Sequence, residues 1–304
     1  MITEVMSNYE HSKQTAETEV LGDSGNSELH FYPSELVVDG YQIEKRISIT
    51  GASEVMQALS NETGELVALK VPRTPNAAEM IRREVSVHGA IGQHCFIAAM
   101  VGSGTQHGAP FIATRMQEGG TMAGLVRETE VSDQGLDRPE LRRRIKLLGH
   151  CAAGVAALHS MGFVHRDIKP ANIGIGRNDT ARLLDLGIAD RPMANPEIEH
   201  IWGTPGESVA PEGYRGEVSF QGDVWAHAVT AYRILTGVPA FEVPEERTVF
   251  GFYYKASEGL RYTPRELNDN IPSDLDRIIA ESLHPDPHKR PTISELQEVY
   301  GRAA

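Results

Sequence analysis

The eight residues 165–172, with the sequence HRDIKPAN, constrain the fold of this chain more than any other stretch. They place an acid, two bases and an amide directly after a long helical pattern and a single apolar pair, Phe163 and Val164. Polar groups at this density cost free energy when they are buried without partners. The stretch is therefore either a solvated loop or the centre of a functional site. The second interpretation requires partners from elsewhere in the chain.

Composition limits the class of protein. Of the 304 residues, 40% are hydrophobic and 23% are charged, which is typical of a globular protein with one large or two modest domains. The net charge of −13 argues against nucleic acid as a partner. The two cysteines, Cys95 and Cys151, cannot form a disulfide framework, which favours a reducing compartment.

The chain has no run of about 20 apolar residues and no basic N-terminus followed by an apolar segment. We therefore expect no membrane span, no secretory signal and a cytoplasmic location, with delivery into another cell left open. Residues 1–35 are rich in Ser, Thr, Asn and Glu without periodicity, which predicts a flexible acidic tail. This tail is either a solubilising arm or a docking or autophosphorylation segment.

The first half of the chain beyond the tail has short strand patterns, at 41–49, 55–59, 66–71, 97–101 and 110–116. Short strands joined by turns indicate an antiparallel sheet. One helix is predicted between them at 77–91.

Beyond the polar run 117–120 the pattern becomes mainly helical, and a lobe boundary is expected there. Asp137 and Glu140 have the spacing of a capping box, with Glu140 expected to reach back to the cap. Further helices are predicted at 223–235, 274–283 and 292–300, and short strands at 173–175 and 182–184.

Six motifs occur in the order and with the spacing of eukaryotic-type Ser/Thr protein kinases. They are VALK at 67–70, HRDIKPAN at 165–172, DLG at 185–187, APE at 210–212, DVW at 223–225 and Arg290 with Pro291. The chain resembles this family over residues 38–302. The resemblance implies an α+β, bilobal fold, with a small antiparallel-sheet N-lobe carrying one helix and a larger, mainly helical C-lobe. The implied bounds are 36–117 for the N-lobe with its hinge and 118–304 for the C-lobe.

The resemblance assigns the catalytic roles to four residues. Asp167 orients the substrate hydroxyl and accepts its proton, and Lys169, the Ser/Thr-kinase form at its position, steadies the γ-phosphate. Lys70 holds the α- and β-phosphates and pairs with Glu84, with Glu79 as the rival partner. The expected cofactors are ATP and Mg²⁺, with Mn²⁺ as an alternative metal.

The resemblance also assigns the cofactor and structural sites. Asn172 and Asp185 would ligate Mg²⁺, since both offer hard oxygen donors. The ATP-binding set is Ile47, Ser48, Thr50, Gly51, Ser53, Val55, Ala68, Lys70, Thr114, Arg115 and Gln117, with the Arg115 carbonyl and the Gln117 amide reading the adenine edge. The structural and regulatory set is His165, Arg166, Thr204, Glu212, Asp223 and Arg290.

Two departures from the family pattern affect the nucleotide site. Ser48, Thr50 and Ser53 stand where the family has glycines, which should stiffen or lift the phosphate loop, unless their hydroxyls donate to phosphate instead. Gly174 stands where a large apolar residue usually forms the adenine floor, so a weaker or reshaped pocket is expected.

A third departure lies in the segment 185–212. It has no Ser, Thr or Tyr between Asp190 and Thr204, although Arg166 belongs to the arrangement that pairs with a phosphorylated residue there. We hypothesise that Glu197 or Glu199 supplies a permanent negative charge instead.

These observations favour an active protein Ser/Thr kinase with a protein substrate. The alternative is a pseudokinase that acts as a binding or scaffold module, supported by the glycine-poor loop and Gly174. A small-metabolite kinase is disfavoured by the APE segment, which in the family shapes a peptide-binding ledge. The oligomeric state stays open.

Overall fold

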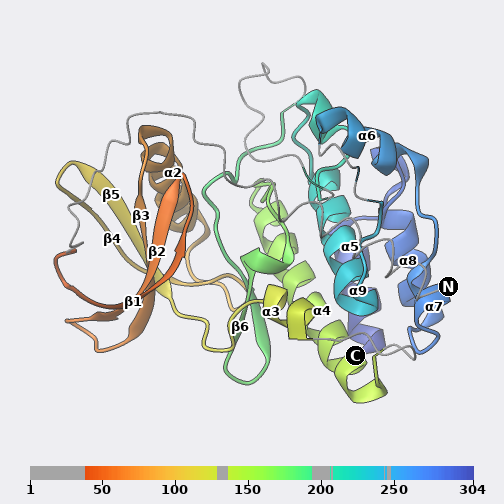
Figure 1. Ribbon diagram of the computed structural model, residues 1–304, viewed down its shortest axis with the longest axis horizontal. Coiled ribbons are helices and arrows are strands. Elements are labelled where there is room, and N and C mark those ends of the chain that lie inside the picture. The colour runs from red at the N-terminus through yellow and green to blue at the C-terminus, as the bar shows by residue number, and fades with distance from the viewer. Residues whose placement is uncertain (1–37, 129–135, 194–205, 207, 243, 245–247) are drawn as a thin grey trace.

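The computed structural model describes residues 38–128, 136–193, 206, 208–242, 244 and 248–304. A sheet with one helix forms one lobe, and mainly helices form the other (Figure 1). This arrangement confirms the predicted α+β, bilobal architecture. None of the helices in the described part is long and apolar enough to cross a membrane.

The N-lobe is built on a five-stranded antiparallel sheet in the order β1-β2-β3-β5-β4. Its strands are β1 Tyr41–Ile49, β2 Ser53–Ser60, β3 Leu66–Pro72, β4 Met100–Gln106 and β5 Ala109–Arg115. Val67, Leu69 and Val71 are buried in the lobe core, whereas Ala68 and Lys70 between them are half-buried on the opposite face. Alternation with period two therefore directs Lys70 away from the core of its own lobe.

Helix α2 (Pro75–Ile91) packs across β3 and β5. Thr74 caps it by accepting a hydrogen bond from the Ala77 N–H, and Pro75 occupies the first turn, where its missing N–H is harmless. Ile81, Glu84 and Val87 are buried at steps of three, so the helix face that meets the sheet carries one acid.

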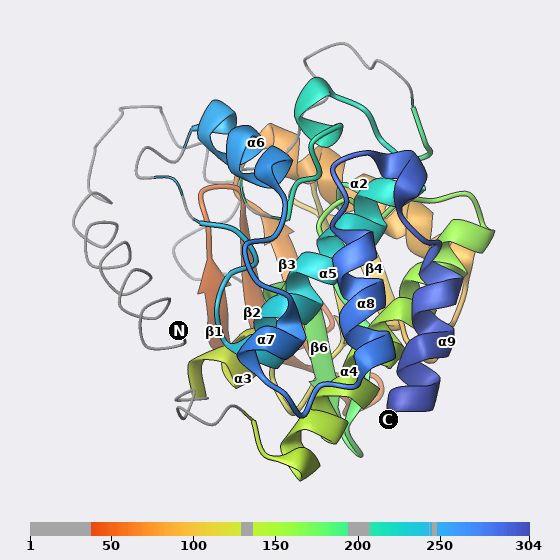
Figure 2. The ribbon, with the colours of Figure 1, turned by 90° about the vertical axis from the view of Figure 1, so that its right-hand side faces the viewer.

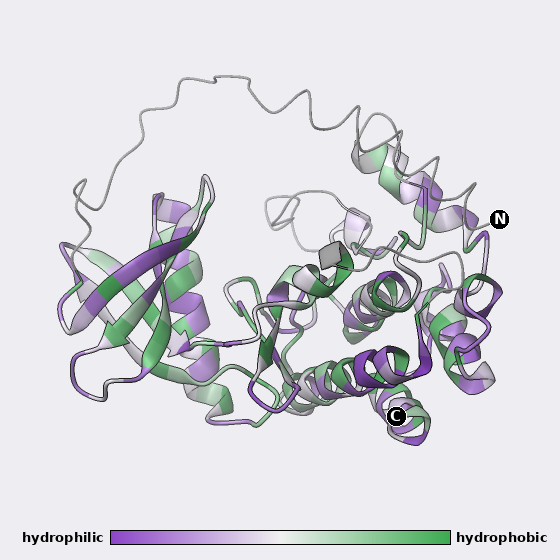
Figure 3. Ribbon diagram, turned by 60° about the horizontal axis from the view of Figure 1, so that its bottom comes forward, coloured by the Kyte–Doolittle hydropathy of each residue, from purple (hydrophilic) through white to green (hydrophobic). Residues whose placement is uncertain are grey.

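The C-lobe is organised around α5 (Phe220–Thr236), which is apolar nearly all round and packs against α4 and α8 (Figure 2). The other helices are α3 Met122–Glu128, α4 Arg138–Ser160, α6 Val249–Glu258, α7 Pro264–Leu267, α8 Ser273–Ser282 and α9 Ile293–Ala303, with 3-10 turns η1 Pro170–Asn172, η3 Gly213–Arg215 and η4 Pro287–Lys289. Green and purple residues alternate along most elements in Figure 3, as expected for elements with one apolar and one polar face.

The two-stranded sheet of β6 (Ile173–Gly176) and β7 (Thr180–Leu183) lies where the lobes meet (Figure 1). The Ala98 N–H donates to the Leu183 carbonyl at 2.9 Å, and the Leu183 N–H donates to the Phe96 carbonyl at 2.9 Å. On the other side, the Gly119 N–H donates to the Ile175 carbonyl at 2.8 Å. The N-lobe segment between α2 and β4 and the segment that crosses between the lobes are thus bonded to the same hairpin.

Two local predictions were wrong, and three short helices were not predicted. The strand expected at 97–101 begins only at Met100, because Ile97 and Ala98 pair with Leu183 of β7. Asp137 does cap α4, accepting the Glu140 N–H at 2.9 Å, but the Glu140 side chain bonds to Arg144 instead of reaching back. The short helices α3, α6 and α7 were not predicted, since a few turns carry too little periodic pattern.

Candidate active site

The loop 165–172 is held from below by Asp223 of α5. Its carboxylate is buried, with 1% of the side chain exposed, and accepts the N–H groups of His165 at 2.7 Å and Arg166 at 2.8 Å. His159, at the end of α4, adds a contact of 2.8 Å from Nε2 to Asp223 Oδ2. The sequence placed Asp223 under the loop but gave His159 no role.

His165 shapes the loop through both ring nitrogens. Nδ1 accepts the Asp167 N–H at 3.2 Å, and Nε2 lies 3.1 Å from the Leu184 carbonyl. Both ring nitrogens are thus engaged with backbone groups, one within the loop and one in the segment after β7.

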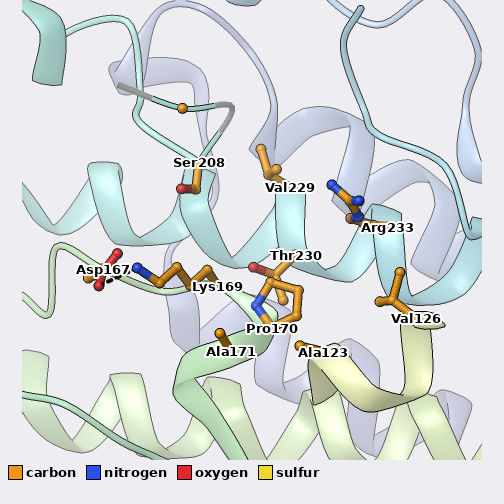
Figure 4. Close-up of a pocket in the computed structure, with 11 residues that line it drawn as sticks. Ala123, Val126, Asp167, Lys169, Pro170, Ala171, Ser208, Val229, Thr230 and Arg233 are labelled. Carbon is orange, nitrogen blue, oxygen red and sulfur yellow. Dashed lines mark hydrogen bonds and ion pairs between the residues drawn. The ribbon is translucent and has the colours of Figure 1, made fainter. Parts of the chain in front are cut away.

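Asp167 is the centre of the polar cluster. Lys169 Nζ donates to its Oδ2 at 2.8 Å, and Asn172 Nδ2 donates to the same oxygen at 2.7 Å and to the Asp167 carbonyl at 2.9 Å. Figure 4 shows Asp167 and Lys169 at one end of a pocket of about 440 Å³ that extends past Ser208 to Arg233. A carboxylate held in this way faces a space large enough for a substrate side chain.

Lys70 contacts two acids, Glu84 of its own lobe and Asp185 of the other. Its Nζ lies 3.0 Å from Glu84 Oε2 and 2.6 Å from Asp185 Oδ1. The other Glu84 oxygen accepts the Leu186 N–H at 3.3 Å, so one buried carboxylate joins α2, β3 and the segment after Asp185. The rival, Glu79, is 67% exposed and pairs with Arg82 on its own helix. The structure therefore brings Glu84, and not Glu79, to Lys70.

The charges of Lys70, Glu84 and Asp185 shift one another's pKa values. Burial alone would lower the pKa of Lys70, but the Glu84 and Asp185 carboxylates raise it well above its usual value. Burial raises the pKa of Glu84 despite the neighbouring ammonium. Burial also opposes the charge on Asp185, yet Lys70 holds the pKa of Asp185 below its usual value. Two carboxylates share one ammonium, so the cluster carries surplus negative charge.

That surplus fits a divalent cation. The candidate ligands are the Asp185 carboxylate and the Asn172 side-chain carbonyl, and oxygen donors of this kind suit Mg²⁺. Their backbones are neighbours, because the Leu184 N–H donates to the Asn172 carbonyl at 2.9 Å. Asp185 has φ of +54°, a conformation that is unfavourable for a non-glycine residue and that the Gly187 N–H, donating to Asp185 Oδ1 at 3.2 Å, helps to hold.

The candidate adenine site lies on the cleft face of the sheet. Ala68 lies opposite Thr114 in the β3–β5 pairing, and Lys70 lies opposite Val55 in the β2–β3 pairing. Directly opposed residues of antiparallel strands present their side chains on the same face. These four predicted residues therefore lie on the same face of the sheet. Ile47, also in the predicted set, is exposed near the end of β1.

Gln117 contributes a side-chain role that the sequence did not reveal. Its Nε2 donates to the Arg115 carbonyl at 2.8 Å, and its Oε1 accepts from Arg182 at 3.2 Å. A Cβ on Gly174 would lie 2.5 Å from Gln117 Cγ. Gly174 therefore makes room for the Gln117 side chain. The Arg115 carbonyl keeps its second lone pair for another donor.

The Thr50 hydroxyl is used inside the phosphate loop. It donates to the Ser53 carbonyl at 3.1 Å and accepts the N–H groups of Ala52 at 3.3 Å and Ser53 at 3.0 Å. Arg73 donates to the Thr50 carbonyl at 2.8 Å. The Thr50 side chain thus closes the loop on itself and engages two of its backbone amides.

Glu212 and Arg290 form a buried bidentate ion pair, with N–O distances of 2.6 and 2.8 Å and side chains 1% and 0% exposed. Arg290 also donates to the carbonyls of His284, Gln221 and Pro285, and its guanidinium lies 4.9 Å from the Trp225 ring centroid. Its polar atoms are well satisfied for a buried charge.

The structure describes only some of the residues named in the regulatory predictions. Arg166 has φ of +71°, and its Nη1 donates to the Ile188 carbonyl at 3.4 Å. Thr204, Glu197 and Glu199 lie outside the described residues, as does the tail 1–35. Among the described residues, the acids whose charges act on Arg166 are Asp190 and Asp223.

Comparisons with known proteins agree with this geometry. A family model described as the protein kinase domain matches residues 41–300. The serine/threonine-protein kinase PknB of Mycolicibacterium smegmatis is 27% identical over 83% of this chain and 41% of its own length. The serine/threonine-protein kinase pkn2 of Myxococcus xanthus is 29% identical over 85% of this chain and 32% of its own length.

A probable serine/threonine-protein kinase PknB of Corynebacterium glutamicum is 30% identical over 68% of this chain and 33% of its own length. The chain thus spans between about a third and two fifths of these relatives. Because the family model covers most of the sequence, from β1 to α9, the chain belongs to the protein kinase domain family.

Proposed function

We propose that this chain transfers the γ-phosphoryl group of Mg·ATP to a Ser or Thr hydroxyl of a protein. The observation that carries the proposal is the joint placement of Lys70 with Glu84 and Asp185, and of Asp167 with Lys169 and Asn172. The names of the three relatives support the same activity. Phosphoryl transfer needs positioned charge more than covalent chemistry, and both clusters supply it.

The residues have distinct tasks in this proposal. Lys169 and Asn172 both donate to Asp167 Oδ2, which leaves Oδ1 as the acceptor for the substrate hydroxyl proton among the hydrogen bonds of the described residues. Lys70, held by Glu84, holds the phosphates of ATP. Mg²⁺, held by Asp185 and Asn172, neutralises phosphate charge when bound. The pocket beside Asp167 gives the substrate side chain its approach.

The test is phosphate transfer from Mg·ATP to a generic basic protein, followed by identification of the phosphorylated amino acids. We expect phosphoserine and phosphothreonine, with incorporation abolished by a chelator. Incorporation equal to that in the chelated sample would overturn the proposal, and phosphotyrosine alone would correct its substrate class.

The second candidate function is a scaffold that uses the kinase fold without phosphotransfer. Its support is the phosphate loop, in which Thr50 engages two amides, and the Gln117 side chain on the Arg115 carbonyl. A thermal-shift measurement with Mg·ATP separates nucleotide binding from transfer, because a ligand that binds only the folded state raises its apparent stability. A Tm rise without phosphate transfer would favour the scaffold.

Replacing Thr50 with Gly should strengthen ATP binding. The change releases the amides of Ala52 and Ser53, and each hydrogen bond they then make is worth about 0.5–1.5 kcal/mol, so KM for ATP should fall roughly two- to tenfold. Thr63→Gly, in the turn at the far end of the β2–β3 hairpin, is the matched control, because its hydroxyl accepts only the Glu65 N–H. An unchanged or raised KM for Thr50→Gly would show that the Thr50 hydroxyl does not withhold these two amides from ATP.

Replacing Gly174 with Ala should displace Gln117. The added Cβ lies 2.5 Å from Gln117 Cγ and 3.2 Å from Leu184 Cδ2, so a side chain must move, at a cost of about 1–3 kcal/mol. The same change in a Gln117→Ala background should cost less, since the clashing atom is gone. Equal losses of Tm in both backgrounds would show that the two positions do not interact.

A further inference from the structure

Asp190 lies in the segment after Asp185, and its backbone is fixed against the catalytic loop. The Val164 N–H donates to the Asp190 carbonyl at 2.7 Å, and the Asp190 N–H donates back to the Val164 carbonyl at 3.0 Å. Val164 immediately precedes His165, so the position of Asp190 is tied to the start of the loop that carries Asp167.

The Asp190 side chain reaches the other lobe. Its Oδ2 lies 2.6 Å from Arg83 Nη1, while Oδ1 accepts the Arg191 N–H at 2.8 Å. Arg83 is half-buried on α2 and directly precedes Glu84, the partner of Lys70. Because the helix is rigid between consecutive residues, holding Arg83 fixes the rotation that points Glu84 at Lys70.

The Asp190 carboxylate acts on two cations, Arg83 and Arg166. Burial lowers the pKa of the Arg166 guanidinium, Asp190 opposes that effect, and the charge of Arg83 adds to it. The charges of Arg83 and Arg166 therefore oppose each other. Asp190, paired with Arg83 at 2.6 Å, offsets both of them, and Asp223 also offsets that of Arg166.

Apolar packing at this contact is incomplete. Met80 and Ile188, together with Glu79, Arg83 and Gly187, line a hollow of about 10 Å³ between α2 and the segment. A hollow of that size holds at most one water molecule. The Arg83–Asp190 ion pair therefore adds a second polar contact to the Leu186 N–H to Glu84 hydrogen bond that joins the same two elements.

We propose that Asp190 is a positioning residue that docks α2 onto the segment after Asp185 and so holds Glu84 against Lys70 without a phosphoryl group on that segment. The inference rests on the proposed function of the Lys70 cluster. The charges of Asp190 and Asp223 both act on Arg166 in the described part of the chain, and the hypothesis of a permanent charge on Glu197 or Glu199 stays a separate prediction.

The test compares Asp190→Asn, Arg83→Gln and the double variant in the full chain. Asn keeps the shape and removes the charge, so kcat should fall roughly tenfold, and the double variant should be no worse than either single one because both remove the same interaction. Asp190→Glu should restore part of the activity. Arg82→Gln is the matched control, since Arg82 directly precedes Arg83 on the helix and pairs with the exposed Glu79.

Hydrogen exchange provides a readout that does not depend on activity. Asp190→Asn should reduce the protection of α2 and of the Leu186 N–H, which donates to Glu84, while Tm changes little. Wild-type protein treated with phosphatase should keep its activity. Loss of activity on that treatment, or unchanged kcat and exchange in Asp190→Asn, overturns the inference.

These outcomes separate the inference from the proposed function. If the wild-type chain transfers phosphate and Asp190→Asn behaves like it, the kinase function stands and the role of Asp190 falls. If the wild-type chain transfers none, the kinase function falls, and the exchange of α2 still decides whether Asp190 docks the helix.

Discussion

Asp167→Asn is expected to lower kcat for protein phosphorylation by about 10²- to 10⁴-fold, the usual contribution of a positioned general base. The amide cannot accept the substrate proton. Its NH₂ group also cannot accept the hydrogen bonds that Lys169 and Asn172 now donate to Asp167 Oδ2. KM for ATP should change little, because the phosphates are assigned to Lys70 on the other side of the cleft.

The measurement is steady-state kinetics with a Tm for each protein. Asp179→Asn is the matched control: Asp179 lies in the β6–β7 turn and pairs with Arg143 at 2.8 Å, away from the Asp167 cluster. Its kcat should equal that of the wild type. If Asp167→Asn keeps most of its kcat while Tm is unchanged, Asp167 is not the base.

Arg290→Met should lower the free energy of unfolding by about 3–5 kcal/mol, the range for removing one partner of a buried ion pair. The change leaves the Glu212 carboxylate, 1% exposed, without its bidentate partner. The carbonyls of His284, Gln221 and Pro285 lose a charged donor at the same time. Burying an uncompensated charge is much more costly than losing a contact at the surface.

Arg277→Met provides the comparison. Arg277 pairs with Glu281 on the exposed face of α8, and pairs of that kind contribute about 0–1 kcal/mol. Chemical denaturation of both variants measures the difference. A double variant that also replaces Glu212 with Leu should recover part of the loss, because no lone charge stays buried. Equal costs for Arg290→Met and Arg277→Met would refute the structural role of the Glu212–Arg290 pair.

The sequence predicted the bilobal α+β fold, because short motifs at fixed spacing are local information. Lys70 and Asp167 belong to those motifs, whereas Glu84 does not. Ile97 and Ala98 show where this fails, since their apolar character suits a strand of either lobe and only the fold decides that they pair with β7.

For the same reason, the sequence could not predict which hydrogen-bond partners some side chains take. A threonine in the phosphate loop can face solvent, phosphate or its own backbone, and the pattern does not say which Thr50 chooses. Gln117 bonding to the Arg115 carbonyl depends on the space left by Gly174, which lies 57 positions away on another lobe. In the sequence Asp190 stands out only as the start of a stretch without hydroxyls, and nothing in the pattern pairs it with Arg83.

The β6–β7 hairpin has a mechanical consequence. The N-lobe segment between α2 and β4 is bonded to it through Ala98 and Leu183, and the segment that crosses between the lobes is bonded to it through Gly119 and Ile175. We therefore expect a movement that opens the cleft to be a tilt of the whole N-lobe about this hairpin. The loop between β1 and β2 then moves with that lobe as one body.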